Sequence, residues 1–185
     1  MEKLNLDVAI WELLGDKKTF RKEGVFMRNN QPVKMIFTVG NFLVEADVVE
    51  VQRKPTITKD GNIFRRIKIR DEEHEAILVV WGSKSNRRNL DLFSSPFMPE
   101  RIRIKYPVRP SDRYIMKYGV ALWAHQDITI IETITSKDPS VFRDPDEEWE
   151  ENEDLHGSID QLPDGYEDIL HPEGEGDYDS EFDFY

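Results

Sequence analysis

The stretch from Ile63 to Arg70 constrains the fold most, because its side-chain pattern fits a β-strand and little else. Successive side chains of a strand point to opposite faces of the sheet. Ile63, Ile67 and Ile69 fall on one face. The other face carries one aromatic ring and three cations, those of Phe64, Arg66, Lys68 and Arg70. We therefore predict a strand with one buried face and one flat, basic face that reaches the surface.

The neighbouring segments predict further strands on both sides of this one. Apolar residues alternate from Phe42 onward and change parity near Val48 and Val49, as expected for a long strand bent by a bulge. The Asp60-Gly61 pair is a hairpin turn signal. A turn at 71–73 then leads to the nearly continuous apolar run 76–82, which is typical of the most buried strand of a sheet.

The remaining pattern completes an order of elements that belongs to a known architecture. Residues 83–93 are compatible with a short helix, 101–106 alternate again, and segments 118–123 and 128–134 close the series after a basic loop. Three strands, a short helix and two strands is the order of an OB-fold, a five-stranded Greek-key barrel with its helix between strands three and four. We predict a mainly all-β domain of this kind at residues 41–143.

Residues 1–40 are interpreted as an N-terminal extension. Leu6, Ile10 and Leu13 have helical spacing and precede Gly15, which predicts a short helix. Residues 16–38 fit either a strand or an irregular segment, and the pattern does not choose between them.

Charge divides the chain at residue 143. The net charge of the whole chain is -12, yet all 25 Lys and Arg and only 19 of the 37 acids lie in residues 1–143, a net charge of +6. Residues 144–185 hold the other 18 acids and no Lys or Arg, a net charge of -18. This acidic segment has no apolar periodicity from which to build a core, so we predict a disordered tail at 144–185.

Cations and rings gather at the places where a single-stranded nucleic acid would bind an OB-fold. Phosphates need cations, and bases stack on exposed rings. The two loops that border the binding face of an OB-fold are also basic here, and the second carries several tyrosines, Tyr118 among them. The loop residues predicted to bind nucleic acid are Arg53, Lys54, Lys105, Tyr106, Arg109, Arg113, Tyr114 and Lys117. Together with Phe64, Arg66, Lys68 and Arg70 they form the predicted basic and aromatic interface.

The run Ile77-Leu78-Val79-Val80-Trp81-Gly82-Ser83 resembles the third strand of OB-folds in replication protein A and related single-strand-binding proteins. In that family the strand ends in Leu-Trp-Gly and the Trp stacks on a base; Val80 replaces the usual Leu here. The resemblance covers about residues 41–134 and implies a stacking role for Trp81. The other reading of Trp81 is a core residue that fixes the packing of the barrel.

The C-terminus carries a second resemblance, to the tails of bacterial and phage single-strand-binding proteins. Those tails are acidic and end in an aromatic residue, as Phe182, Phe184 and Tyr185 do here. The likeness implies that the tail competes with nucleic acid for the basic face and recruits replication or repair proteins through its terminal rings. Solubility is the plainer role for an acidic tail.

Other classes of function find little support in the sequence. The chain has no Cys, its four His are scattered, and no phosphate-binding glycine loop or nucleophile motif is present. We therefore expect no enzyme activity, no metal and no cofactor. No apolar run is long enough to cross a bilayer and the N-terminus lacks a signal pattern, so a cytoplasmic protein without membrane contact is expected.

Three functions stay open at this point. The first is nonspecific binding of single-stranded DNA in replication, recombination or repair. The second is a protein-interaction module built on the same fold, and the third is RNA binding. The sequence does not indicate oligomeric state.

Overall fold

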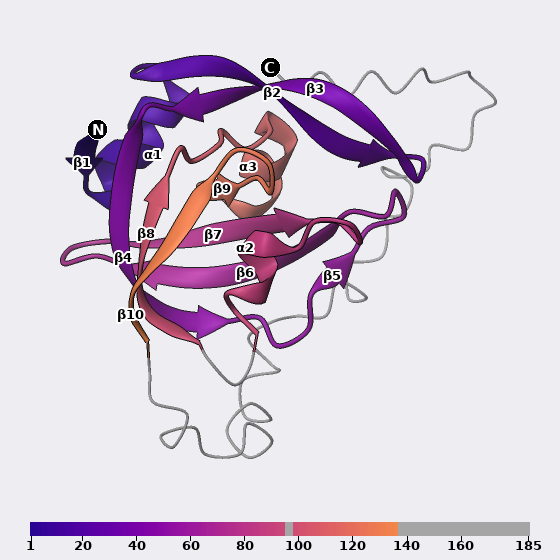
Figure 1. Cartoon of the computed structure of the whole chain (residues 1–185). Coiled ribbons are helices and arrows are strands. Elements are labelled where there is room, and N and C mark those ends of the chain that lie inside the picture. The colour runs from indigo at the N-terminus through magenta and orange to yellow at the C-terminus, as the bar shows by residue number, and fades with distance from the viewer. Residues whose placement is uncertain (95–97, 137–185) are drawn as a thin grey trace, which may run out of the picture. The chain divides into compact units, whose positions relative to one another are not determined.

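The computed structural model of this protein describes residues 1–94 and 98–136, in which β-strands predominate (Figure 1). In chain order the elements are β1 (Glu2–Leu4), α1 (Leu6–Leu14), β2 (Thr19–Arg28), β3 (Gln31–Gly40), β4 (Phe42–Val51), β5 (Thr56–Ile57), β6 (Ile63–Arg70), β7 (Glu75–Gly82), α2 (Arg88–Asp91), β8 (Pro99–Lys105), α3 (Asp112–Tyr118), β9 (Ala121–Ala124) and β10 (Ile130–Ser136). The predicted tail, with Phe182, Phe184 and Tyr185, lies outside the described residues.

Strand pairing closes the main sheet into a barrel. β4 pairs with β6 and β6 with β7, all antiparallel. β9 runs parallel to β7. β10 runs antiparallel to β8, and β8 in turn pairs antiparallel with β4. Only residues 125–129 separate β9 from β10 along the chain, so these two strands together close the barrel between β7 and β8. With α2 between β7 and β8, this is the OB-fold, and the predicted fold class is confirmed.

The predicted bulge in the first barrel strand is confirmed. The register between β4 and β6 shifts between Val48 and Glu50. Before the shift, the inward side chains of β4 are Phe42, Val44 and Ala46; after it, Val51 is the buried residue. The extra residue bends β4, so its first half pairs with β8 and its second half with β6.

The first 14 residues belong to the barrel core. β1 pairs in parallel with β4, and the buried residues Leu6, Ala9 and Leu13 of α1 pack into the same hydrophobic cluster as β4 and β6. The carboxylate of Asp71, in the turn between β6 and β7, accepts a 2.6 Å hydrogen bond from the Leu6 amide at the start of α1. Burial raises the pKa of Asp71, but its backbone donors outweigh that effect and hold the pKa below its ordinary value.

Residues 16–38, for which the sequence left two readings, form a long β-hairpin with Gly40 at its end. β2 and β3 pair from Thr19–Gly40 to Arg28–Gln31, which leaves a two-residue turn. Asn29 and Asn30 in that turn have φ angles of 50° and 60°. Two consecutive positive φ angles define the type I′ turn that matches the twist of a hairpin, and Asn tolerates this conformation better than other side chains.

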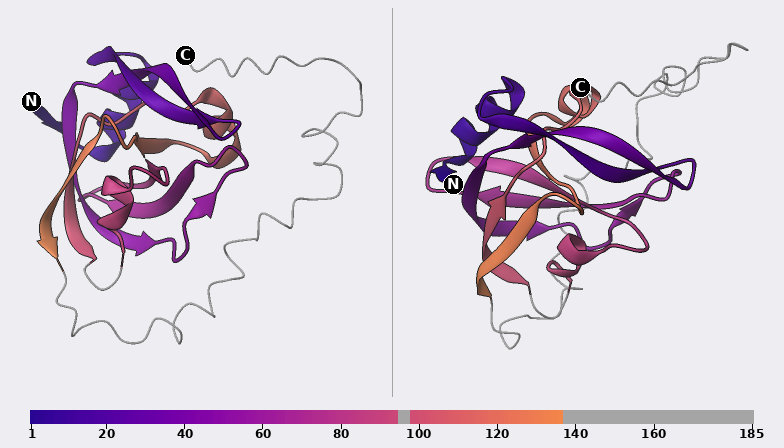
Figure 2. Two further views of the ribbon diagram at one scale, coloured as in Figure 1. Left: turned by 45° about the vertical axis from the view of Figure 1, so that its right-hand side comes forward. Right: turned by 45° about the horizontal axis from the view of Figure 1, so that its top comes forward.

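This hairpin covers part of the outer surface of the barrel. Phe37 and Val39 of β3 form a second hydrophobic cluster with Val79, Trp81 and Trp123, whose side chains point outward from β7 and β9. The hairpin runs from α1 to the loop that precedes β6 (Figures 1 and 2). Residues 1–94 and 98–136 therefore form two cores, one inside the barrel and one between barrel and hairpin.

The tip of the hairpin is fastened by polar contacts. The side chain of Asn62 accepts a hydrogen bond from the Met27 amide at 2.9 Å and donates one to the Met27 carbonyl at 2.7 Å. The amide of Asn29 donates to the Asp60 carboxylate at 2.9 Å. Asn62 is buried, so these bonds compensate a polar group that would otherwise be unpaired.

The junction between hairpin and barrel leaves no room for a side chain at Gly40. A Cβ there would lie 2.6 Å from the ring of Phe42, which is fully buried. We predict that Gly40→Ala lowers the free energy of unfolding by about 1 to 3 kcal/mol, because a rigid buried ring must shift. Urea denaturation measures this. Asn41→Ala, a change at the exposed neighbour, is the control, and equal stability of the two variants would contradict the prediction.

Candidate nucleic-acid interface

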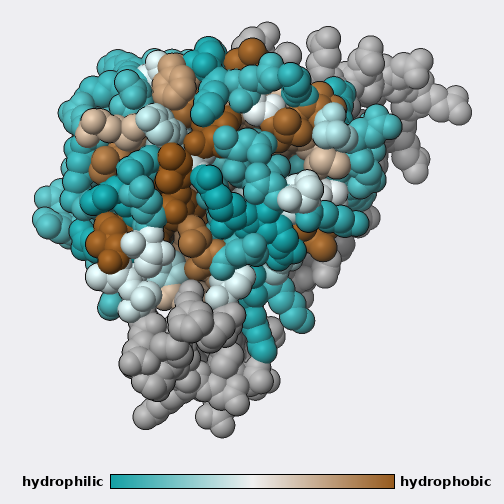
Figure 3. Space-filling model, in the orientation of Figure 1, coloured by the Kyte–Doolittle hydropathy of each residue, from teal (hydrophilic) through white to brown (hydrophobic). Residues whose placement is uncertain are grey.

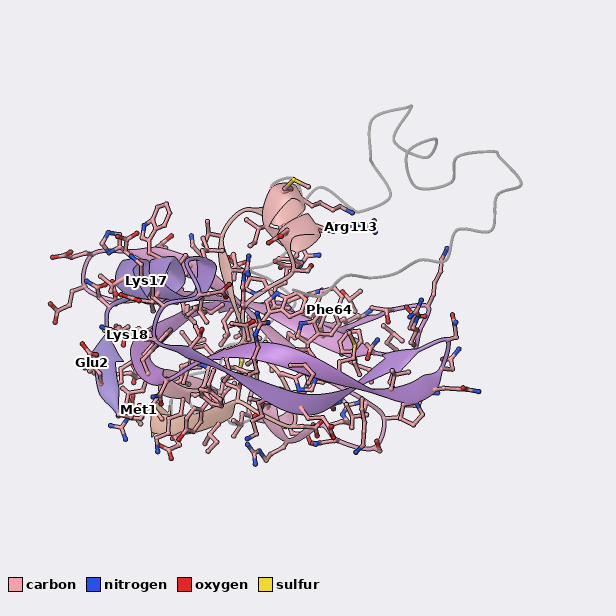
Figure 4. The ribbon with its side chains drawn as sticks, turned by 90° about the horizontal axis from the view of Figure 1, so that it is seen from above. Met1, Glu2, Lys17, Lys18, Phe64 and Arg113 are labelled. Carbon is pink, nitrogen blue, oxygen red and sulfur yellow. The ribbon has the colours of Figure 1, made fainter. Side chains whose placement is uncertain are left out.

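A cluster of cations and rings forms where the outer face of β6 meets α3. The guanidinium carbon of Arg66 lies 5.7 Å from the ring centre of Phe64 and 5.0 Å from that of Tyr118. The Lys117 ammonium lies 5.0 Å from the Tyr118 ring. Cations at such distances are attracted to the faces of aromatic rings. We call these four residues and Tyr114 the cation–aromatic cluster. Seen from above, Phe64 lies between the hairpin and α3 (Figure 4).

Arg66 is held by its backbone, and no carboxylate in the described part of the chain neutralises its charge. Its amide donates to the Gln52 side-chain oxygen at 3.0 Å, and its carbonyl accepts from the Gln52 amide at 2.9 Å. Among the residues that the structure describes, Arg66 forms no ion pair, and its charged group meets rings instead. A cation in this setting is available to an anionic ligand.

Helix α3 carries the rest of the cluster and is attached to the barrel mainly through Tyr114. Ser111 caps the helix by accepting a hydrogen bond from the Tyr114 amide, and Gly119 ends it with φ 78°. The Tyr114 ring stands edge-on to Trp123 at 5.5 Å. Burial raises the pKa of Tyr114 to about 12, against the opposing effect of Arg66, so its hydroxyl stays protonated at neutral pH.

Trp81 does not occupy the exposed position that stacking on a base requires. Its side chain is 8% exposed, and its ring lies 5.3 Å from Phe26, 4.9 Å from Phe64 and 5.2 Å from Trp123. An exposed Trp81 ring is therefore a wrong expectation, and the packing interpretation of this residue describes its place in the structure. The reason is the hairpin, which brings Phe26 over a ring that β7 alone would leave on the surface.

The cations at the far end of β6 are paired with one carboxylate. Lys68 contacts Glu75 at 2.8 Å, and Arg70 donates through Nε to the same carboxylate at 2.7 Å. Hydrogen bonds from Lys68 and then Arg70 lower the pKa of Glu75. Both cations lie on the predicted face, but their charge is partly balanced. Exposed pairs of this kind contribute little to stability, so a phosphate can exchange for Glu75.

Lys105 lies away from the cluster, in a ladder of alternating charges on the outer face of β4, β8 and β10. It contacts Glu132 at 2.6 Å, and Arg103 bridges Glu132 and Glu45. The prediction that Lys105 borders the same face as β6 is wrong, because Lys105 lies on β8, which β4 separates from β6 in the sheet. The charges of this ladder are compensated by cross-strand neighbours.

The other predicted loop residues are spread around the cluster. Arg53 and Lys54 are exposed in the loop after β4, and Arg113 is exposed on α3 (Figure 4). Arg109 is largely buried and paired with Asp16 and Asp112, so it anchors the start of α3. Tyr106 is half-buried and packs edge-on against Phe20.

Sequence reasoning did not select several residues that shape this surface. Tyr118 was noted only as a companion of the basic loop, and Trp123, Gln52 and Phe26 were not considered. The Asn29-Asn30 pair is the one local signal that could have revealed the hairpin. No local pattern indicates that the hairpin folds back over β7.

The comparisons with known proteins add a likeness in fold. No protein-family model matches the chain, and no curated protein matches it. The OB domain of a Thermoplasma acidophilum protein, solved in solution by NMR, is similar in structure at 12% sequence identity. The alignment covers 58% of this chain and 85% of that domain, with a TM-score of 0.35.

Membrane-spanning helices and clusters of metal ligands are absent from the described residues. Residues 1–94 and 98–136 contain no helix that is long and apolar enough to span a bilayer. In the same part of the chain, no three His, Asp or Glu side chains come together as metal ligands.

His125 lies at the base of the hairpin and is fully buried. Its ring packs on Phe37 at 4.4 Å, and its Nδ1 accepts a hydrogen bond from the Asp127 amide. Burial lowers the pKa of His125 to about 4, although the charge of Asp127 acts in the opposite direction. The imidazole is therefore neutral in the folded protein at neutral pH.

This buried histidine makes the stability of the domain depend on pH. Because the pKa is lower in the folded state, the unfolded chain binds a proton first as pH falls below about 6.5. We predict that the free energy of unfolding decreases by up to about 3 kcal/mol between pH 6.5 and pH 4 through this group. Urea denaturation of the wild type and His125→Gln at several pH values isolates the effect; parallel curves would rule it out.

Proposed function

We propose that this protein binds single-stranded nucleic acid, with single-stranded DNA as the expected ligand, on the surface formed by β6 and α3. The observation that carries the proposal is Arg66, a cation held between the rings of Phe64 and Tyr118 without a carboxylate partner in the described part of the chain. Rings and cations side by side are what a single strand needs. Lys105, in contrast, is paired with Glu132.

In the proposed complex, the rings of the cation–aromatic cluster contact bases and its cations contact phosphates. The half-buried Phe64 and the 38% exposed Tyr118 offer ring faces or edges to bases. Arg66 and Lys117 contact the phosphates between those bases. Arg53, Lys54 and Arg113 lie on the flanking loop and helix, where they extend the path of the backbone.

Binding of a labelled oligo-dT, followed by fluorescence anisotropy, tests the proposal. We predict that Arg66→Ala weakens binding about tenfold or more, since a hydrogen bond to a charged group contributes about 1.5 to 3 kcal/mol. Lys105→Ala is the matched control, because its cation lies outside the cluster, and its affinity should change less than about twofold.

The salt dependence separates a phosphate contact from a loss of folding. Each phosphate contact to a single strand adds about 0.7 to the logarithmic salt slope. Arg66→Ala should reduce the slope by about that amount, whereas Arg66→Lys keeps the charge and should retain it. Absence of salt-sensitive binding by the wild type, also after removal of 144–185, would refute the proposal. Competition with matched RNA decides between DNA and RNA.

The acidic tail extends the proposal to regulation and partners. Residues 144–185 lie outside the described residues, and their charge of -18 is opposite to that of the rest of the chain. A tethered segment acts at an effective concentration on the order of millimolar. We propose that it competes with the single strand for the basic surface, and that its terminal rings recruit proteins of replication, recombination or repair.

Removal of the tail tests this competition. We predict that a chain ending at Arg143 binds oligo-dT more tightly than the full chain at low salt, and that the difference shrinks as salt screens the tail. Anisotropy titrations at two salt concentrations measure it. Equal affinities at low salt would exclude competition by the tail. They would not contradict the proposal that the barrel binds the single strand.

A protein-interaction module is the second candidate function, and exposed apolar side chains favour it. Trp11 on α1 is 66% exposed and Met116 on α3 is 82% exposed. On the face shown in Figure 3, hydrophobic residues reach the surface in small groups among hydrophilic ones. Trp11 lies on a different element from the proposed interface, so the two functions are compatible with each other.

A further inference from the structure

A continuous series of rings leads from the surface of the cation–aromatic cluster into the second core. Tyr118 lies 4.8 Å from Tyr114, Tyr114 lies 5.5 Å from Trp123, and Trp123 lies 5.2 Å from Trp81. The first ring is exposed and the last two are buried. Tyr114 therefore lies between Trp123 and the exposed Tyr118, whereas Trp81 is covered by Phe26 and Phe64.

The buried end of this series carries hydrogen-bond donors without acceptors. The indole N–H groups of Trp81 and Trp123 are buried and have no hydrogen-bond partner among the described residues. The Tyr114 hydroxyl and the Arg66 Nε are also buried without a hydrogen-bond partner among the described residues. An indole nitrogen only donates, so what these groups lack is an acceptor. Buried donors without acceptors are uncommon because they cost stability.

The cover over Trp123 belongs to a short helix at the surface. Helix α3 has seven residues, and none of them is buried. So short a helix is not stable alone, and little burial means a low local stability. Trp123, in contrast, is fixed: its backbone bonds to Val108 in both directions, at 2.8 and 3.2 Å, and its strand pairs with β7. Displacement of α3 would leave the tryptophan platform in place.

From these observations we propose that Tyr114 occupies, on Trp123, the position of a nucleobase. When a single strand binds, α3 moves outward and a base stacks on Trp123 in place of the tyrosine ring. A carbonyl oxygen of that base then accepts a hydrogen bond from the Trp81 indole, since the N–H of Trp123 lies in the plane of the ring on which the base stacks. Thymine, cytosine and guanine carry such a carbonyl, whereas adenine does not. The inference rests on the proposed function and adds a second base position with a preference.

A base fits this position better than an apolar peptide side chain. It is flat enough to replace the Tyr114 ring, and its edge brings the acceptor that the Trp81 indole lacks. Arg66, which lies over the neighbouring Tyr118 ring, would meet the adjoining phosphate.

Tryptophan fluorescence tests the position of the base. The full chain with Trp11→Phe and Trp149→Phe reports only on Trp81 and Trp123. Addition of oligo-dT should quench this emission, because a base stacks on Trp123. If anisotropy shows binding while the emission stays unchanged, the inference is wrong and the proposed function stands. If anisotropy shows no binding, the proposed function itself fails.

Two tyrosine variants show whether the Tyr114 ring covers Trp123 or itself contacts the single strand. Tyr114→Ala removes the competing ring and should strengthen oligo-dT binding by about threefold to tenfold. Tyr118→Ala, the matched variant on the same helix, removes an exposed contact and should weaken binding. Weaker binding by Tyr114→Ala, with an unchanged circular dichroism spectrum, would overturn the inference. Tyr114→Phe keeps the ring and should stay within about threefold of the wild type.

Base preference gives an independent readout. Trp81→Phe keeps a ring in the second core but lacks the N–H donor. We expect the ratio of affinities for oligo-dT over oligo-dA to fall by about threefold in this variant, as for one lost hydrogen bond. An unchanged ratio would contradict the assignment of the Trp81 indole donor to a base carbonyl.

Discussion

The packing of the β2–β3 hairpin on the outer face of β7 and β9 decides which part of the barrel a ligand can reach. Without the hairpin, Trp81 and Trp123 would lie on the surface of the sheet. With it, Phe26 and Phe37 enclose them in a second core, and the accessible ring surface moves to β6 and α3. Burying several aromatic side chains contributes more free energy than any surface ion pair in the molecule. The location of the proposed interface is therefore a consequence of aromatic packing.

Barrel closure depends on contacts between segments that are distant in the chain. α1 fills the core beside β4, and its first turn is tied to the β6–β7 turn through Asp71, 65 residues away. The hairpin tip is tied to Asp60 and Asn62 in the same manner. These polar anchors satisfy backbone groups that would otherwise be unpaired, so they orient the added elements as well as stabilise them.

The proposed binding surface differs from the charge ladder in the surroundings of each cation, more than in the number of cations. Lys105 and Arg103 belong to a ladder in which every charge has an opposite neighbour across the strands. Arg66 has rings as neighbours and a glutamine that holds its backbone. The net charge of -12 does not report on this surface, because 18 of the acids lie in the tail segment.

The sequence by itself determined the OB-fold order of strands, the bulge in β4, the two faces of β6 and the division of charge at Arg143. Each of these follows from local periodicity or from counting, which tertiary contacts do not alter. Only the tertiary structure decided that Trp81 is buried, that Lys105 belongs to another face and that Arg66 meets Tyr118. Those outcomes depend on which distant segments pack together, and neither the Asn29-Asn30 turn nor the pattern of β7 contains that information.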